Sequence, residues 1–359
     1  MKLKRVSFLF VLSLSIAALP ASASTTTDES KLKLIKTITG DISPKSVLAS
    51  NNGLVSAHNM MYRHSVTIYD AETMELKKTI PDSVNLSKFG YSKYPGLYKG
   101  APVEGAYSPD GKYLYFTNYA MYGKGFKKEG HDTCSPASGF DSSYLSRINL
   151  AKNEIDAVYP VGSVPKVVKV TPDNKYILVS NWCSYTVTVI SVETQKTVKS
   201  IKIGRYPRGI SISSDSKSAY VAEMGGNQIH QIDLETFAVT FIPIGSNPRA
   251  IVLSPDDTKL YATLNISGKV IAWDLQTNKA IKTVATGKSA RSLAISSDGS
   301  ALFVVNFGGG TLSKVRTSDM TVIQNIKVCA EPIGVTFDSS TSRTWVACYG
   351  GSIKVFANQ

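Results

Sequence analysis

Apolar and polar residues alternate in short runs along almost the whole chain, a pattern typical of β-strands that bury one face. Residues 186–190 (Thr-Val-Thr-Val-Ile) and 197–203 are examples, and turn residues separate such runs. A turn of the type Ser-Pro-Asp-Gly recurs, and its aspartates are 42, 41 and 42 residues apart: Asp173, Asp215, Asp256 and Asp298. A period near forty that holds about four short strands is typical of propeller blades.

The number of blades follows from where the first strand of each period begins. A proline or alanine after a turn marks that start seven times, at Pro44, Pro102, Pro165, Pro207, Pro248, Ala290 and Pro332. After Pro332 the chain has residues for only three strands, whereas one unassigned apolar run, 32–38, precedes Pro44. We expect this run to pair as the outermost strand of the last blade and close the ring. The predicted fold is all-β, a seven-bladed β-propeller with four antiparallel strands per blade.

The second strand of several blades carries a further signature. It reads Tyr-Phe-Thr-Asn at 115–118, Leu-Val-Ser-Asn at 178–181 and Phe-Val-Val-Asn at 303–306. These residues resemble the Tyr-Val-x-Asn motif of the YVTN-type seven-bladed propellers, and the resemblance covers nearly everything after the first residues. Similar propellers include a periplasmic protein that binds single-stranded DNA, surface-layer proteins, amine-dehydrogenase subunits and, more distantly, lactonases and streptogramin lyases. The resemblance implies the fold and leaves the activity open.

The first residues predict export. Lys2, Lys4 and Arg5 precede an apolar run, 6–19, and 21–23 read Ala-Ser-Ala, so 1–23 are interpreted as a secretory signal peptide and 24–359 as a single propeller domain. The apolar run is too short to span a membrane, and no later stretch is long and apolar enough. We expect a monomer in the periplasm, in the medium or on the cell surface.

The chain is basic, and this admits an anionic partner. Its formal net charge is +13, and removal of the leader with its three cations leaves +10. Nucleic acid, an acidic glycan or another envelope component would suit such a charge. A lysine-rich surface that keeps an exported protein soluble is the simpler explanation and is favoured by charge alone.

One face of the predicted ring collects the residues that break the repeat. The connections that follow each second and fourth strand share this face, and two of them carry insertions, 81–100 and 119–141. All four cysteines map to the same face, and their positions predict disulfides Cys134–Cys183 and Cys329–Cys348. A Cys/His metal site with His131 is the alternative, although no Cys-x-x-Cys spacing is present.

Cations recur at the start of the innermost strands. The residue after the first proline or alanine is basic in five blades, whereas blade two has Val103 or Glu104 and blade seven has Ile333; the five are Lys45, Lys166, Arg208, Arg249 and Arg291. Innermost strands line the central channel, so these cations are expected to crowd its mouth and to hold an anionic ligand. Alternatively, polar residues at the ends of the second strands satisfy them: Asn59, Asn118, Asn181, Glu223, Asn265 and Asn306. Asn118, Asn181, Glu223 and Asn306 are therefore included in the candidate site.

Aromatic residues near this mouth extend the candidate site. Trp182 and Tyr185 could provide apolar contact to a ligand, or could pack between blades as rim aromatics commonly do.

Motifs for catalysis are missing from the sequence. It has no nucleophile elbow, phosphate loop, haem-attachment motif or metal-ligand spacing, so no cofactor and no metal is predicted. The one candidate acid–base set is His58 with Glu104 and Glu223. We therefore expect an exported binding or scaffold protein that captures an anionic or envelope-associated partner. A propeller that binds single-stranded nucleic acid and a lyase- or lactonase-like enzyme are the alternatives.

Overall fold

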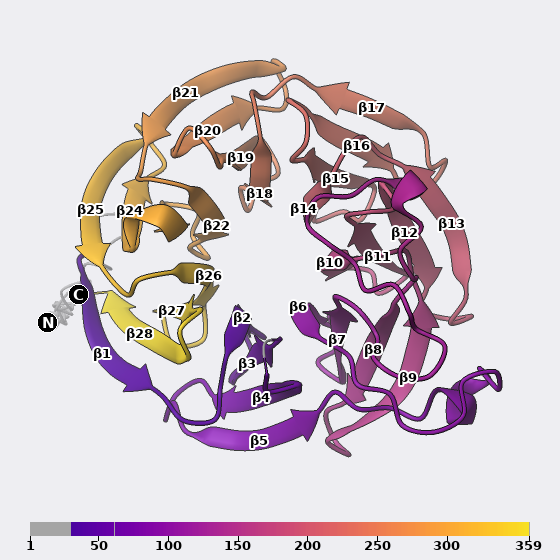
Figure 1. Cartoon of the computed structure of the whole chain (residues 1–359). Coiled ribbons are helices and arrows are strands. Elements are labelled where there is room, and N and C mark those ends of the chain that lie inside the picture. The colour runs from indigo at the N-terminus through magenta and orange to yellow at the C-terminus, as the bar shows by residue number, and fades with distance from the viewer. Residues whose placement is uncertain (1–29, 61, 359) are drawn as a thin grey trace, which may run out of the picture.

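The computed structural model describes residues 30–60 and 62–358, so the predicted signal peptide, 1–23, lies outside the described residues. Seven four-stranded antiparallel sheets stand around a central axis (Figure 1). Blades one to three consist of β2 (Pro44–Ala49), β3 (Leu54–Asn59), β4 (Ser65–Asp70) and β5 (Leu76–Pro81); β6 (Pro102–Tyr107), β7 (Tyr113–Asn118), β8 (Tyr144–Asn149) and β9 (Glu154–Pro160); and β10 (Pro165–Val170), β11 (Tyr176–Asn181), β12 (Thr186–Ser191) and β13 (Thr197–Lys202).

The remaining four blades repeat this order. They consist of β14 (Pro207–Ile212), β15 (Ser218–Glu223), β16 (Ile229–Asp233) and β17 (Val239–Ile242); β18 (Pro248–Leu253), β19 (Lys259–Leu264), β20 (Lys269–Asp274) and β21 (Lys279–Ala285); β22 (Ala290–Ile295), β23 (Ala301–Asn306), β24 (Thr311–Arg316) and β25 (Thr321–Lys327); and β26 (Pro332–Asp338), β27 (Arg343–Cys348), β28 (Ser352–Asn358) and β1 (Leu32–Ile38). The predicted seven-bladed, four-stranded propeller is confirmed.

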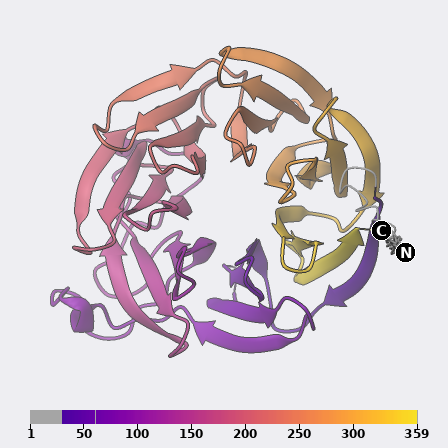
Figure 2. The ribbon, with the colours of Figure 1, turned by 180° about the vertical axis from the view of Figure 1, so that it is seen from behind.

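The ring closes through β1, as the sequence predicted. β1 pairs antiparallel with β28, from Leu32 opposite Asn358 to Ile38 opposite Ile353. Figure 2 shows from behind that the two ends of the described chain meet at this last blade. The last blade therefore combines a strand from the N-terminal part of the chain with three from the C-terminal part, and β1 covers the outer edge of β28.

The hydrophobic core lies between neighbouring blades because each sheet buries both faces. Trp345 of β27 is fully buried and packs near Tyr69 of β4, with ring centroids 6.3 Å apart, in a cluster that joins blades seven and one. Comparable clusters join blades three and four, and blades four and five. Each blade is thus stabilised by its neighbours, and the innermost strands are held around the axis.

The two insertions pack against each other beside blade two. Isolated β-bridges join Val84 to Tyr98 and Lys99 to Tyr122, so the first insertion is tied to itself and to the second. They contain the short 3-10 helices η1 (Leu86–Phe89) and η2 (Pro136–Ser138), and η3 (Phe307–Gly309) follows β23. In Figure 1 the second insertion crosses the near face of blades two to four. No helix in the described part of the chain is long and apolar enough to cross a membrane.

Candidate anion site at the channel mouth

The candidate site begins with an irregularity at the start of every innermost strand. In blade three Pro165 pairs with Asn181, but the next pair is Val168 with Val179, so two residues after the proline face a single residue of the partner strand. The register shifts at this same place in all seven blades. Such a β-bulge bends the strand and redirects a side chain. The bulges therefore occur where the sequence places the five cations.

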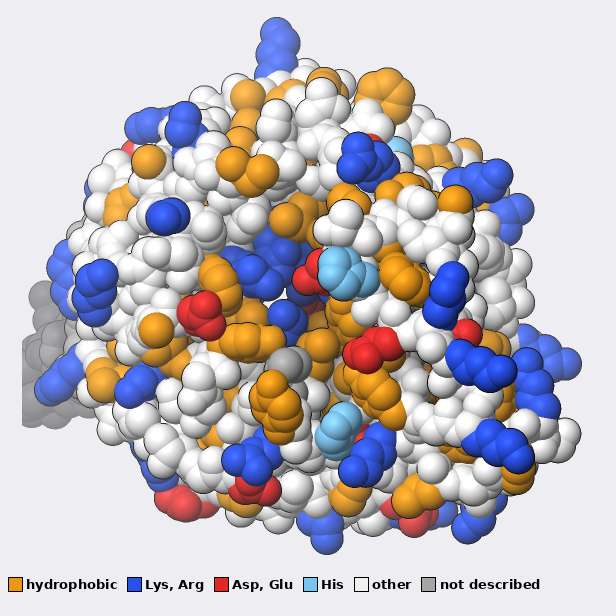
Figure 3. All heavy atoms as spheres, viewed as in Figure 1, with side chains coloured by type: hydrophobic (Ala, Val, Ile, Leu, Met, Phe, Trp, Pro, Cys, Tyr) orange, Lys and Arg blue, Asp and Glu red, His pale blue; other side chains and the backbone are white. Residues whose placement is uncertain are grey.

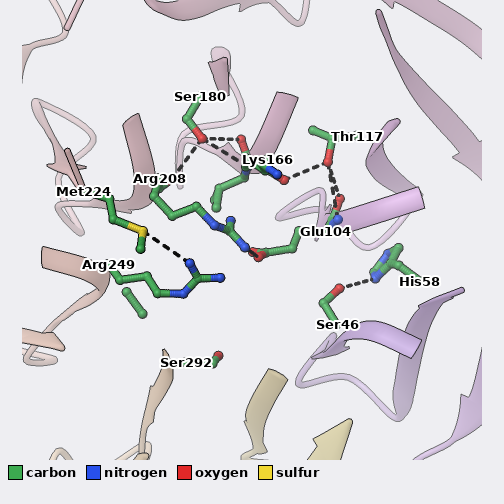
Figure 4. A network of polar contacts seen from close by, with 12 residues as sticks. Ser46, His58, Glu104, Thr117, Lys166, Ser180, Arg208, Met224, Arg249 and Ser292 are labelled. Atoms are coloured by element: carbon green, nitrogen blue, oxygen red, sulfur yellow. Dashed lines mark hydrogen bonds and ion pairs between the residues drawn. The ribbon is translucent and has the colours of Figure 1, made fainter. Parts of the chain in front are cut away.

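Figure 4 shows two of these cations, Arg208 and Arg249, extending side by side into the space between the innermost strands. Seen from the face with the insertions, Lys and Arg side chains lie in the depth of the central opening (Figure 3). We call the following set the channel mouth: Lys45, Lys166, Arg208, Arg249 and Arg291, with the carboxylates Glu104 and Asp132. The structure thus brings all five predicted cations together.

Two of the five cations have carboxylate partners. Lys166 is buried, and its Nζ donates to Asp132 Oδ1 at 2.9 Å. Its ammonium also lies 4.3 Å from the ring centroid of Tyr119. Arg208 is buried and donates through a guanidinium nitrogen to Glu104 Oε1. These two pairs use both carboxylates of the channel mouth.

The other three cations have no carboxylate within ion-pair distance among residues 30–60 and 62–358. Lys45 lies 5.1 Å from the ring centroid of Tyr349, and Arg291 lies 4.3 Å from that of Phe307. Arg249 is buried and donates to Met224 Sδ at 3.4 Å, a weak acceptor. The Nε of Arg291 is buried without a hydrogen-bond partner. Five cations against two carboxylates leave an excess of three positive charges when all are ionised.

This excess changes the acid–base behaviour of the mouth. Burial, reinforced by the charge of Arg291, holds the pKa of Lys45 well below its usual range. Burial also lowers the pKa of Lys166 to about 7, although the charge of Asp132 opposes the shift. Burial and the neighbouring arginines lower the pKa of Arg249 well below its ordinary value, and that of Arg291 to about 10. Each shift favours loss of a proton because like charges are held together away from water.

The pKa values of the two carboxylates are lowered as well, but for a carboxylate this favours the charged form. Burial alone would raise the pKa of Asp132, but the charge and hydrogen bond of Lys166 lower it to about 2. The pKa of Glu104 is likewise below its ordinary value because Arg208 outweighs burial. Both groups are therefore ionised at neutral pH.

A cavity of about 290 Å³ extends along the axis beneath the mouth. Arg208, Arg249 and Arg291 line it together with Glu104 and with backbone groups of the innermost strands. Lys169, which lies further along β10, also lines the cavity, and burial lowers the pKa of its ammonium. The cavity volume is sufficient for a small anion with its hydration water.

The asparagines of the candidate site have a different role. Asn118, Asn181 and Asn306 are fully buried, and their hydrogen bonds are made within their own blades, so their place in a ligand site stays a prediction. Asn181 Oδ1 accepts from the backbone N–H of Gly162, and its Nδ2 donates to Thr186 and Thr188. Asn118 and Asn306 make the corresponding bonds to the third strands of their own blades. Asn181 and Asn306 also bond to the connection before the first strand and so fasten it to the blade.

Glycine is found in the turn before the first strand because a larger residue there would clash with the asparagine side chain. A Cβ on Gly162 would lie 2.8 Å from atoms of Asn181, and one on Gly287 would lie 2.7 Å from Asn306. In blade five the equivalent position, opposite Pro248, is Leu264, and Asn265 follows it. The repeated Gly…Asn pair is therefore a packing unit of the blade.

The members of the predicted acid–base set have separate hydrogen-bond partners. Glu223 occupies the asparagine position of blade four, where it accepts from the N–H of Arg205 and from Gln228 and contacts His230 at 3.0 Å. His58 is fully buried between blades, bonds to Ser46 Oγ at 2.9 Å, and has a pKa lowered by burial to about 4. His58 interacts electrostatically with Glu104, whereas Glu223 is engaged by Arg205, Gln228 and His230, so the structure shows no contact that joins the three side chains.

The two predicted aromatics lie at the mouth, where they support it. Trp182 is buried, stacks on Tyr206 with centroids 4.4 Å apart, and donates from Nε1 to the backbone oxygen of Asp132 at 2.9 Å. Tyr185 is half-buried, and its hydroxyl donates to the backbone oxygen of Cys134 at 2.7 Å. Both rings hold the second insertion in place, and Trp182 has no free face for a ligand.

Both predicted disulfides are confirmed, and no free cysteine remains among the described residues. Cys134–Cys183 joins the second insertion to blade three. Cys348 stands opposite Pro332, which is the position of the asparagine in other blades, and its bond to Cys329 ties the preceding connection to blade seven. Oxidation uses all four thiols, so none is left as a thiolate ligand beside His131. Within 30–60 and 62–358 no group of three or more His, Cys, Asp or Glu residues is placed to hold a metal ion.

Sequence reasoning missed Asp132, the carboxylate nearest to Lys166. It lies in an insertion without internal repeat, so no period places it over the channel. The neighbouring Cys134 was the available signal, because its predicted bond to Cys183 already fixed this loop beside blade three.

Comparisons with known proteins agree with this architecture. A family model described as YNCE-like beta-propeller matches residues 138–300. Antigen Lp49 of Leptospira interrogans serogroup Icterohaemorrhagiae serovar copenhageni (strain Fiocruz L1-130) is 31% identical over 153 residues, which are 40% of this chain and 33% of Lp49. The chain thus matches about a third of the length of this curated relative. Hydrazine synthase of Kuenenia stuttgartiensis superimposes with a TM-score of 0.68 at 16% identity, covering 89% of this chain and 96% of that one, and shows the fold alone.

Proposed function

We propose that this seven-bladed propeller, which resembles YNCE-like propellers over residues 138–300, is an exported binding protein that captures an anionic group at its channel mouth. The partner is an anionic small molecule or the anionic part of an envelope component. The two disulfides support export, since such bonds persist in oxidising compartments.

The observation that carries the proposal is the set of cations without carboxylate partners: Lys45, Arg249 and Arg291. Holding three like charges together and partly out of water is unfavourable unless an opposite charge joins them. Neutral side chains at these positions would avoid this cost, so the fold alone does not explain why cations are present. The arginine forks suit carboxylate and phosphate oxygens, which accept two parallel hydrogen bonds.

Calorimetric titration with citrate, inorganic phosphate and sulfate at low salt tests the proposal. We expect binding that weakens as salt is added, and a loss of affinity of about 100-fold or more in Arg249→Gln/Arg291→Gln, because each charge-assisted hydrogen bond contributes roughly 1.5–3 kcal/mol. The matched control is Lys199→Gln/Lys202→Gln, which removes two exposed charges from the outer strand β13.

The control should bind like the wild type. Equal affinity of the wild type and Arg249→Gln/Arg291→Gln for every anion would contradict the proposal, provided that both melt at similar temperatures.

A further inference from the structure

The second insertion, 119–141, places one carboxylate over the channel mouth. Asp132 Oδ1 accepts from Lys166 Nζ at 2.9 Å and from the Tyr119 hydroxyl at 3.2 Å. The backbone oxygen of Asp132 accepts from Trp182 Nε1 at 2.9 Å. Asp132 is thus bound to the mouth by both its side chain and its backbone.

The two members of this ion pair differ in their surroundings. The Lys166 side chain is 7% exposed, whereas that of Asp132 is 74% exposed. Lys166 belongs to the wall of the ring, so its charge cannot leave. Asp132 is the member of the pair that can move into water, because its side chain is the more exposed of the two. Glu104 differs, since it projects from the innermost strand β6 and is part of the wall.

A disulfide holds Asp132 at the mouth. Cys134, two residues further along, is bonded to Cys183 of blade three, with the Cα atoms 5.4 Å apart. The Tyr185 hydroxyl donates to the Cys134 backbone oxygen at 2.7 Å. The reach of Asp132 is therefore limited by a covalent bond, and its carboxylate is kept at a high local concentration near Lys166.

We propose that Asp132 is a tethered carboxylate that occupies the place of a ligand carboxylate, and that the ligand carries two or more carboxylate groups and enters by displacing it. This inference rests on the proposed function. Both anions that the mouth already holds are carboxylates, on Lys166 and on Arg208. When Asp132 leaves, four cations face the axis without a carboxylate: Lys45, Lys166, Arg249 and Arg291. One ligand carboxylate then replaces Asp132 on Lys166, and a second reaches Arg249 and Arg291.

Displacement makes Asp132 a competitor of the ligand. Its removal should therefore strengthen binding, whereas removal of an ordinary structural residue should weaken it. This sign separates the proposal from a merely structural role for the loop. A longer acidic side chain at the same position should still compete.

Titration of citrate into the protein at pH 6, below the pKa of Lys166 in the wild type, tests the inference. We expect Asp132→Asn to bind citrate about tenfold more tightly than the wild type, which is about 1.4 kcal/mol, because a competing charge-assisted hydrogen bond is lost. Cys134→Ser/Cys183→Ser should also bind more tightly because the tether is lost. Asp132→Glu should bind like the wild type.

Two controls match these variants. Glu129→Gln removes a carboxylate of the same insertion that bonds to Tyr122, and Cys329→Ser/Cys348→Ser removes the other disulfide. Both should leave citrate affinity unchanged.

Each contrary outcome has its own meaning. Citrate binding by the wild type that is unchanged or weaker in Asp132→Asn overturns the inference and leaves the proposed function standing. Tightening for phosphate but not for citrate overturns the carboxylate class. Tightening in Asp132→Asn but not in a folded Cys134→Ser/Cys183→Ser overturns the role of the tether. No binding of citrate, phosphate or sulfate by any of these proteins overturns the proposed function itself.

Discussion

The rims of blades three and seven each carry one disulfide, and the two disulfides have different structural roles. Cys329–Cys348 ties the connection before blade seven to the end of β27, at the position where several other blades have asparagine, so it serves the repeat. Cys134–Cys183 fixes a loop that no other blade has, and that loop brings Asp132 to Lys166. The comparison teaches that a residue at a repeated position serves the ring, whereas a residue that breaks the repeat is the better candidate for function.

The comparison predicts different losses of stability when each bond is removed. The sequence separation is 49 residues for Cys134–Cys183 and 19 for Cys329–Cys348. In the chain-entropy account these loops correspond to about 4 and about 3 kcal/mol of unfolding free energy. Guanidinium unfolding of the two double serine variants measures both values. A larger loss for Cys329→Ser/Cys348→Ser would show that the blade-seven rim is the more critical structural tie.

A smaller effect should appear in the pH dependence of stability. Lys166 has a pKa of about 7 in the folded protein and about 10.5 when unfolded, so the unfolded state binds more protons between these values. Stability should therefore rise with pH from about 7 to about 10.5, by up to about 1.4 kcal/mol per pH unit from this group. Lys45 acts in the same direction.

Chemical unfolding at several pH values measures this slope. Lys166→Met should reduce it, whereas Lys199→Gln, on the outer strand, should not. A slope that is the same in Lys166→Met and the wild type would contradict the account of a strained positive mouth near Cys134–Cys183.

The sequence predicted the features that repetition or pairing determines. The period gave seven strand starts, the unpaired run 32–38 gave ring closure, and an even cysteine count on one face gave both disulfides. The five cations were found because they follow the same proline or alanine in five blades. Their convergence depends on the β-bulges, which the sequence does not display but the repeat preserves.

The sequence is less informative about the site than about the ring, and the reason is physical. Asn118, Asn181 and Asn306 were assigned to a ligand because they share the rim with the cations, although a residue repeated from blade to blade more readily serves the blade's own hydrogen bonds. Glu223 replaces such an asparagine and inherits its role. Asp132 was missed for the converse reason, because an insertion has no period from which its three-dimensional position can be inferred.

The most direct measurement of the central claim is a crystal structure grown with sodium selenate, with anomalous diffraction recorded at the selenium edge. The account predicts an anomalous peak at the channel mouth, within hydrogen-bond distance of the guanidinium groups of Arg249 and Arg291. Selenate found solely on outer-strand lysines, with those two arginines bonded to protein carboxylates, would contradict it.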